Sequence, residues 1–207
     1  MELTQAHRDA LHEILRWRRD VRHFLPDPID SAVLDRLRAA MDLAPSVGNA
    51  RPWRVLNVVS ADKRAAVTAN FEAANAAAAT PYKGDRRTAY NALKLAGLRD
   101  APVHLAIFTE TDPAAGHGLG RQTMPEMLAY STVAAIHTLW LAARAENLGM
   151  GWVSILDPVG ICKTLDVPES WSLTGYFCLG KAASDDDTPL LHRNAWQENS
   201  PTAWRNV

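Results

Sequence analysis

The sequence predicts a single α+β domain in which helices cover one sheet. Three observations support this class. The 207 residues are 47% hydrophobic and 22% charged, which is enough apolar material for one sizeable core. Segments with helical apolar spacing are interspersed with short β-branched runs. No internal repeat and no linker interrupts the chain, so residues 1–207 are expected to fold as one domain.

Helices and one strand are expected in the first half. Apolar residues recur on one helical face at the start of the chain, and two prolines at 26 and 28 end that helix. Asp30 or Ser31 suits the cap of the next helix, which Pro45 ends. The expected elements, in order, are a helix over 4–19, a helix from about 31 to 44, a strand over 54–59, an alanine-rich helix over 62–80, and helix plus loop over 81–100.

The second half contains the strongest helix signal. Residues 128–147 are apolar nearly all round, which predicts a helix buried in a core or an interface, and Gly149 is expected to stop it. The expected elements around it are a strand over 103–109, an irregular glycine-rich segment over 111–125, strands over 151–155 and 174–179 with a short helix over 159–165 between them, and an irregular tail over 184–207.

Composition argues against several classes of partner and site. A net charge of -1 gives no overall attraction to nucleic acid or anionic lipid. The first fifteen residues form a polar amphipathic pattern rather than a signal peptide, and no apolar run approaches the roughly 18 residues that a membrane span needs. Histidines are scattered without metal-ligand spacing, and Cys162 and Cys178 are expected to be two buried thiols. We therefore expect a cytoplasmic protein without a catalytic metal.

An arginine-rich segment around Asp20 is the first candidate site. Between residues 16 and 24, four arginines and one histidine surround this single carboxylate. Arginine grips phosphate in a bidentate way, and neighbouring cations favour the ionised form of an aspartate. The segment could thus hold an anion and place a carboxylate beside it. A solvated charged turn after a helix explains the same residues equally well.

Two further patches carry small polar groups. Residues 44–53 put a hydroxyl, an amide and a guanidinium on one turn, and residues 149–158 put Ser154 at the end of a buried strand whose glycines would let a ligand approach. A proline turn and a core strand are the simpler interpretations of each patch alone. The glycines at 116–120 lack the spacing of a dinucleotide loop, and no Gly-x-Ser-x-Gly elbow is present. The three patches together indicate a flat polar ligand with a phosphate tail.

The order of these motifs resembles a known family. Arg-Arg-Asp-x-Arg-x-Phe followed by Pro-Ser-x-Gly-Asn-x-x-Pro-Trp is similar to the nitroreductase-type flavoprotein superfamily, over about residues 8–200. Three details resemble one branch of it, whose members fragment flavin. Asp20 stands where other members usually carry serine, residues 120–126 resemble the lid motif of that branch, and residues 151–158 resemble its characteristic strand.

This resemblance implies a fold and an activity. The fold would be a mixed, mostly antiparallel sheet covered by helices, assembled as an intertwined homodimer with FMN at the interface, a lid at about 111–127 and a C-terminal extension at about 184–207. The activity would be oxygen-dependent fragmentation of reduced FMN to 5,6-dimethylbenzimidazole, the lower ligand of cobalamin, with release of erythrose 4-phosphate. FMN and dioxygen would suffice without a metal, and a separate flavin reductase would supply the electrons.

The resemblance also implies roles for residues. Asp20 would act in proton transfer and Ser154 would hold the flavin by a hydrogen bond, while Arg18, Arg19 and Arg22 would bind the phosphate. The complete set implied to contact flavin is Arg18, Arg19, Asp20, Val21, Arg22, Ser46, Asn49, Arg51, Met124, Ser154 and Leu156.

Two positions depart from the family pattern. Arg51 stands where glutamine is expected, and Asn199 stands where relatives tend to carry arginine. Without an arginine at 199, the arginines of the first motif are expected to provide most of the phosphate binding. Two other activities remain open at this point. One is an NAD(P)H-dependent FMN nitroreductase or dehalogenase in which FMN stays bound and cycles. The other is a flavin carrier without enzymatic activity.

Overall fold

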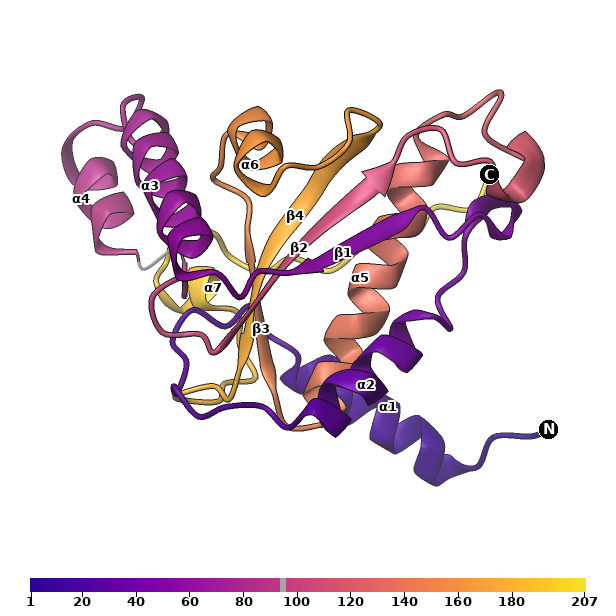
Figure 1. Ribbon diagram of the computed structural model, residues 1–207. Helices are drawn as coiled ribbons and strands as arrows, with labels where there is room; N and C mark the ends of the chain where they lie inside the picture. Colours follow the sequence, from indigo (N-terminus) through magenta and orange to yellow (C-terminus); the bar gives the residue numbers. More distant parts are fainter. Residues whose placement is uncertain (94–95) are drawn as a thin grey trace.

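The computed structural model describes residues 1–93 and 96–207 and contains a four-stranded sheet with helices on both faces (Figure 1). The strand order is β1-β2-β4-β3, and every neighbouring pair is antiparallel. Within the described residues, a parallel pairing occurs at the isolated bridge between Asp20 and Met150. The strands are β1 (Trp53–Asn57), β2 (Val103–Glu110), β3 (Gly149–Val153) and β4 (Trp171–Gly180).

The expected helices are present with shifted ends. The segment expected as helix plus loop contains one helix, while residues 94 and 95 of that segment lie outside the described residues. The tail expected to be irregular also contains a short helix. The helices are α1 (Gln5–Trp17), α2 (Ser31–Met41), α3 (Ala61–Ala78), α4 (Gly84–Ala92), α5 (Met127–Ala145), α6 (Pro158–Leu165) and α7 (Leu190–Arg193), with 3-10 turns η1 (Val47–Asn49) and η2 (Ala115–Gly118).

Alternation along the strands separates two hydrophobic clusters, one on each face of the sheet. On β4, Phe177 belongs to the cluster that includes residues of α2 and α5, whereas Tyr176 belongs to the cluster that includes residues of α3 and α6. On β3, Met150 belongs to the same cluster as Phe177, and Val153 belongs to the same cluster as Tyr176. The sheet is therefore the middle of three layers, and the α+β class is confirmed.

Local polar contacts explain where several helices begin and end. Of the two caps that the sequence allows, Asp30 caps α2 by accepting from the Ala32 amide at 2.8 Å, and Ser31 is the first residue of the helix. Asp157 caps α6 by accepting from two amides, one of them that of Gly160. The prediction that Gly149 stops α5 is wrong. Asn147 takes the left-handed conformation after the helix (φ 57°), and Gly149 is the first residue of β3.

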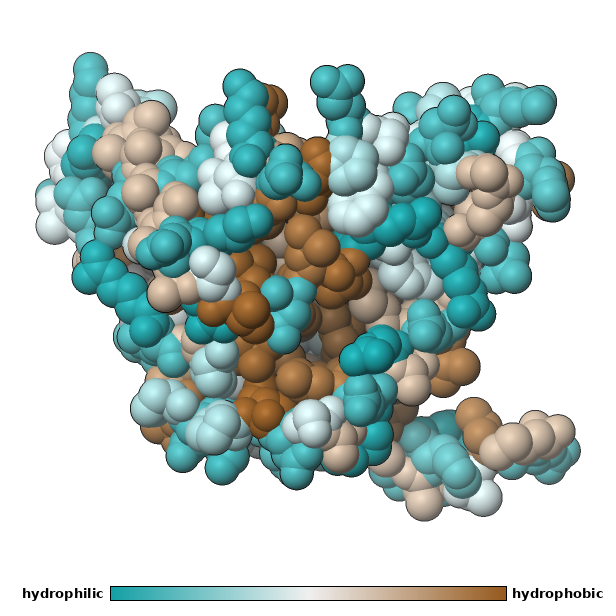
Figure 2. All heavy atoms as spheres, viewed as in Figure 1, coloured by the Kyte–Doolittle hydropathy of each residue, from teal (hydrophilic) through white to brown (hydrophobic). Residues whose placement is uncertain are grey.

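The long helix α5 is buried on one side and open on the other. Ile136 and Leu139 lie in the core, but Tyr130 is 54% exposed and Val133 is 40% exposed. Helix α1 buries none of its residues and projects from the body (Figure 1). Figure 2 shows hydrophobic atoms on the surface of this projecting N-terminal segment, at the lower right. No helix within the described residues is long and apolar enough to span a membrane.

Candidate active site

A cavity of about 270 Å³ lies where the arginine motif meets β3 and the C-terminal segment. We call it the arginine cavity. It collects arginines and aspartates from four separate parts of the chain. Its lining residues are Trp17, Arg18, Arg19, Asp20, Val21, Arg22, His23, Trp140, Arg144, Leu148, Gly149, Ser184, Asp185, Asp186, Thr188, Leu190 and Arg193.

The arginine motif is fastened to β3 through its carboxylate. Asp20 Oδ1 accepts from the Trp152 amide at 2.9 Å, and Asp20 Oδ2 accepts from Arg22 Nε at 2.8 Å. The Val21 amide donates to the Met150 carbonyl at 3.1 Å. Both carboxylate oxygens therefore accept from fixed donors, which holds the side chain in one orientation at the edge of the cavity.

Gly151 makes this close approach possible. A Cβ at position 151 would lie 2.0 Å from the carbonyl oxygen of Val21, far inside van der Waals contact. The sequence interpretation assigned the glycines of this strand to the approach of a ligand. The structure differs, because at Gly151 the close neighbour is the chain's own segment that carries Asp20.

Two cavity arginines have no ion-pair partner within the described residues. Arg19 donates to the backbone carbonyls of Arg18 and Asp187, and the Arg18 guanidinium lies 4.9 Å from the ring of Trp140. Burial and the neighbouring Arg19 cation lower the pKa of Arg18, and the Asp20 carboxylate opposes them. Arg18 Nε, Arg19 Nε and Trp140 Nε1 are buried donors that find no hydrogen-bond partner in the described part of the chain.

These orphaned donors fit an anionic ligand. A buried donor without a partner is costly, and a buried cation without a carboxylate is more so. A phosphate would supply acceptor oxygens and negative charge to Arg18, Arg19 and Trp140 at once. The residues present therefore suit the phosphate end of FMN. Within the described residues, no cluster of histidine, cysteine or carboxylate side chains could hold a metal ion.

Sequence reasoning missed several lining residues from distant elements. Arg144 comes from α5 and Arg193 from α7, and neither belongs to a recognisable motif. Arg193 places a guanidinium in the cavity although Asn199 does not carry the arginine expected of relatives. The Asn199 amide instead donates to His192 Nδ1 at 3.2 Å. The run of aspartates at 185–187 was the available signal, because adjacent carboxylates repel one another and nearby cations relieve that repulsion.

The second predicted patch lies elsewhere in the same chain. Asn49 and Gly48 line an open cavity of about 670 Å³ with Gly116 to Gly120 and Gln122, which we call the loop cavity. Ser46 Oγ accepts from the Arg51 amide at 3.1 Å. Gly48 and Gly116 both have positive φ, and a Cβ on either would lie about 3 Å from the other's carbonyl oxygen. The candidate residues Arg51 and Met124 are exposed nearby in sequence.

Helix α5 separates the two cavities. Ser131 Oγ accepts from the Val47 amide at 3.0 Å beside the loop cavity, whereas Trp140 and Arg144 line the arginine cavity. Thirteen residues of helix between Ser131 and Arg144 correspond to about 20 Å. The sequence predicts one site from three patches, but a single chain brings together only the first and the third among the described residues.

The third patch extends past β3. The strand ends at Val153, two residues before its expected end, so Ser154 lies in the loop that follows. Its side chain is exposed, and it stands two residues beyond Trp152, whose amide holds Asp20. Leu156 is half-buried against the second hydrophobic cluster. Val21 lines the arginine cavity directly.

The protein is thus an α+β protein with a four-stranded antiparallel sheet flanked by helices and an arginine-lined cavity at its edge strand. Residues 15–181 match the Nitroreductase family, and the chain belongs to this family. This match confirms the resemblance inferred from the sequence motifs.

Close relatives and solved structures narrow the comparison. A 5,6-dimethylbenzimidazole synthase of Rhodobacter capsulatus is 62% identical over 204 residues, covering 99% of both chains. The protein of that name from Rhodospirillum rubrum is 50% identical over 194 residues, covering 94% of this chain and 92% of its own. The fold is similar to iodotyrosine deiodinase bound to FMN and 3-iodo-L-tyrosine, with a TM-score of 0.76 and 19% identity over 95% of this chain and 99% of the other. A nitroreductase family protein from Clostridium novyi NT has a TM-score of 0.62 and 17% identity over 83% and 84% of the two chains.

Proposed function

We propose that this chain is a 5,6-dimethylbenzimidazole synthase, which fragments reduced FMN with dioxygen and releases erythrose 4-phosphate. The observation that carries the proposal is Asp20, a carboxylate held by β3 directly beside the unpaired arginines of an anion cavity. Relatives that are 50–62% identical over nearly their full length carry this name, which supports the same reaction here.

The arginine cavity would bind the phosphate of FMN. Arg18 and Arg19 would bind it through Nε donors that have no partner among the described residues, and Arg22 would hold Asp20 at the start of the ribityl chain. Bound reduced flavin supplies the electrons that activate dioxygen, and a separate flavin reductase would deliver it in the reduced form.

Asp20 and Ser154 would carry the proton and hydrogen-bond steps. Asp20 is fixed by one donor on each carboxylate oxygen, and a remaining lone pair would accept a proton from the ribityl side. General-base catalysis of this kind contributes roughly 10²–10⁴ in rate. The exposed hydroxyl of Ser154 would hold the flavin ring by a hydrogen bond. Val21 and Leu156 would contact the flavin on either side of this pair.

The site would be completed by a second copy of the chain. The loop cavity and the arginine cavity lie about 20 Å apart along α5, so one chain does not bring them onto one flavin. The open face of α5, with Tyr130 and Val133, and the unburied helix α1 supply apolar surface for a homodimer. In such a dimer the partner's loop would bring Ser46, Asn49 and Arg51 to the flavin ring.

The glycine-rich segment would close over the bound flavin. Residues 111–127 contain η2 and the exposed Met124, and they adjoin the loop cavity. Closure by such a segment excludes water from reactive intermediates. In the dimer, the lid and the Ser46 loop would thus act together on one side of the ring.

The test is the organic product formed when reduced FMN meets air with the full-length protein. Wild-type protein is expected to release 5,6-dimethylbenzimidazole, whereas Asp20→Asn and Ser154→Gly are expected to lose most of the yield while still binding oxidised FMN. Asp35→Asn, which removes an exposed carboxylate paired with Arg38 on α2, is the matched control and should keep the yield.

Three outcomes would contradict parts of this proposal. Wild-type yield from the Asp20 or Ser154 variant would remove that residue from the mechanism. Rapid oxidation of bound reduced FMN by a nitroaromatic with no loss of flavin, after reduction by NAD(P)H, would indicate a conventional nitroreductase. Simple return to intact FMN in air would indicate a flavin carrier.

A further inference from the structure

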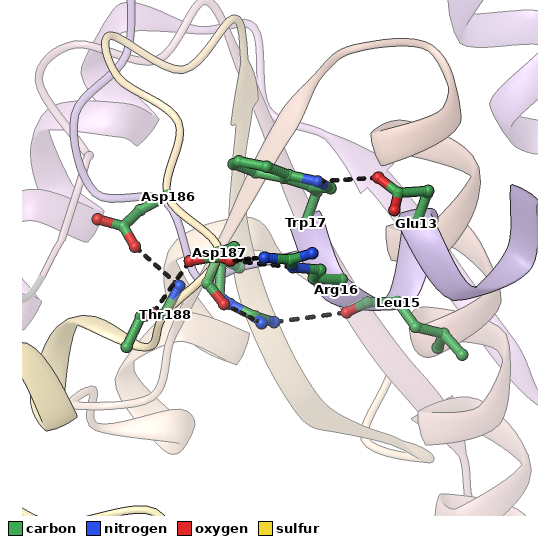
Figure 3. A network of polar contacts seen from close by, with 8 residues as sticks. Glu13, Leu15, Arg16, Trp17, Asp186, Asp187 and Thr188 are labelled. Atoms are coloured by element: carbon green, nitrogen blue, oxygen red, sulfur yellow. Dashed lines mark hydrogen bonds and ion pairs between the residues drawn. The ribbon is translucent and has the colours of Figure 1, made fainter. Parts of the chain in front are cut away.

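Three consecutive aspartates, two of which line the arginine cavity, come from outside the predicted motifs. We call residues 184–188 the aspartate strap. Each aspartate pairs with an arginine from a different helix, and Figure 3 shows Asp187 beside Arg16 and Asp186 beside Thr188. The pairs are Asp185 with Arg144 of α5 at 2.7 Å, Asp186 with Arg193 of α7 at 3.0 Å, and Asp187 with Arg16 of α1 at 2.5 Å.

The strap is held in a defined conformation by its own polar contacts. The Thr188 amide donates to Asp186 Oδ1 at 2.7 Å, and Thr188 Oγ1 donates to Asp187 Oδ1 at 3.0 Å. Asp185 and Asp186 line the arginine cavity, whereas Asp187 faces Arg16 outside its lining. The strap therefore presents two fixed negative charges to whatever occupies the cavity.

These two negative charges lower the net positive charge of the cavity. Five arginines and three aspartates line it, so two positive charges are uncompensated when histidine is counted as neutral. Arg22, Arg144 and Arg193 each pair with a lining aspartate, and Arg18 and Arg19 carry the excess. A phosphate monoester near pH 7 carries a charge of about -1.5 to -2. The excess of the cavity matches that ligand.

We propose that Asp185 and Asp186 set the charge selectivity of the arginine cavity for a phosphomonoester dianion, against more highly charged polyphosphates. This inference rests on the proposed function, because it takes the flavin phosphate as the occupant. Without the strap, five arginines would favour the anion with the most charge. With it, only the unpaired Arg18 and Arg19 attract, and each further negative charge on a ligand meets the strap carboxylates.

Stability alone does not explain the strap. Asp185 is 54% exposed beside Arg144 at 16%, and Arg193 is 45% exposed beside Asp186 at 33%. Ion pairs that reach water on at least one side contribute modestly to folding. Their field nevertheless acts on an anion inside the cavity, where water is partly displaced. The strap thus acts on ligand choice, and its effect is measured by binding.

The experiment compares competing anions on the full-length protein with oxidised FMN. Inorganic phosphate and pyrophosphate are used to displace FMN, followed by flavin fluorescence, in wild type, Asp185→Asn and Asp186→Asn. Loss of one strap charge is expected to raise the preference for pyrophosphate over phosphate by about threefold to tenfold. Riboflavin, which lacks the phosphate, should bind each variant within about twofold of wild type.

The control and the contrary results are equally specific. Asp35→Asn removes the same charge from an exposed arginine pair on α2 and should leave the ratio unchanged. An unchanged ratio in both strap variants, an equal loss of FMN and riboflavin binding, or no displacement of FMN by either anion would overturn the proposal. Thermal unfolding of both variants shows whether each is folded, and if one variant fails to fold, the other still tests the proposal. Because no turnover is involved, protein that binds FMN selectively but makes no 5,6-dimethylbenzimidazole would refute only the proposed function.

Discussion

Replacing Gly151 by alanine tests whether the approach of the Asp20 segment to β3 builds the site. The added Cβ would lie 2.0 Å from the Val21 carbonyl oxygen, so the segment must move away from the strand. Movement breaks the hydrogen bond from the Val21 amide to Met150 and that from the Trp152 amide to the Asp20 carboxylate. One neutral and one charge-assisted hydrogen bond correspond to about 2–4 kcal/mol of lost folding free energy.

Two measurements on Gly151→Ala separate stability from site geometry. For a chain of this size, that loss lowers the melting temperature by about 4–16 °C, and we expect FMN affinity to fall at least tenfold because the arginine motif moves with Asp20. Gly84→Ala is the control, since a Cβ there meets nothing within 4 Å although the φ of +53° adds strain. It should lose about 1–2 kcal/mol and keep wild-type FMN affinity. Wild-type melting and FMN binding in Gly151→Ala would refute the reasoning.

Two further predictions concern acid stability and assembly. Burial and then the Arg64 cation lower the pKa of His104 to about 4, below the roughly 6.5 of an unfolded histidine. Between these two pH values the unfolded chain therefore binds more protons than the folded chain. The free energy of unfolding should fall by up to about 3 kcal/mol as the pH drops from 6.5 to 4. Urea unfolding of His104→Gln should show a shallower decline over that range, and an identical decline would contradict this origin. Val133→Glu places a charge on the exposed apolar side of α5 and should convert a dimer to monomer in light scattering, unlike Asp35→Asn; a wild-type monomer would refute the assembly.

Local signals made most of the fold predictable. Apolar periodicity located the long helix and the strands of the sheet, and Asp30 marked the start of α2 through its side-chain oxygen. The predictions failed where the conformation of a residue depends on a neighbour that is distant in sequence. A glycine after an apolar helical segment is typical of a helix stop, which is why Gly149 was predicted to be one. In the structure, a Cβ on Gly149 would lie 2.7 Å from Val21 Cγ2. Because Val21 is distant in sequence, no local pattern indicates this contact.

The candidate site was predictable in its chemistry and less so in its assembly. The arginine motif and the Ser154 strand do converge, because the Trp152 amide binds Asp20 across 132 positions. The loop of Ser46 was grouped with them by residue type, yet its position depends on Ser131 at the far end of α5. Two partners of the strap aspartates lie far away in the sequence, since Arg16 and Asp187 stand 171 positions apart and Arg144 and Asp185 stand 41 apart.

The length of α5 sets the distance between the two cavities. One end binds the Val47 amide through Ser131, and the other presents Trp140 and Arg144 to the arginine cavity. Each residue of an α-helix advances the axis by about 1.5 Å and turns it by about 100°. A single inserted residue between these ends would therefore turn one anchor by about 100° relative to the other, so the number of residues between Ser131 and Trp140 fixes how the two anchors face.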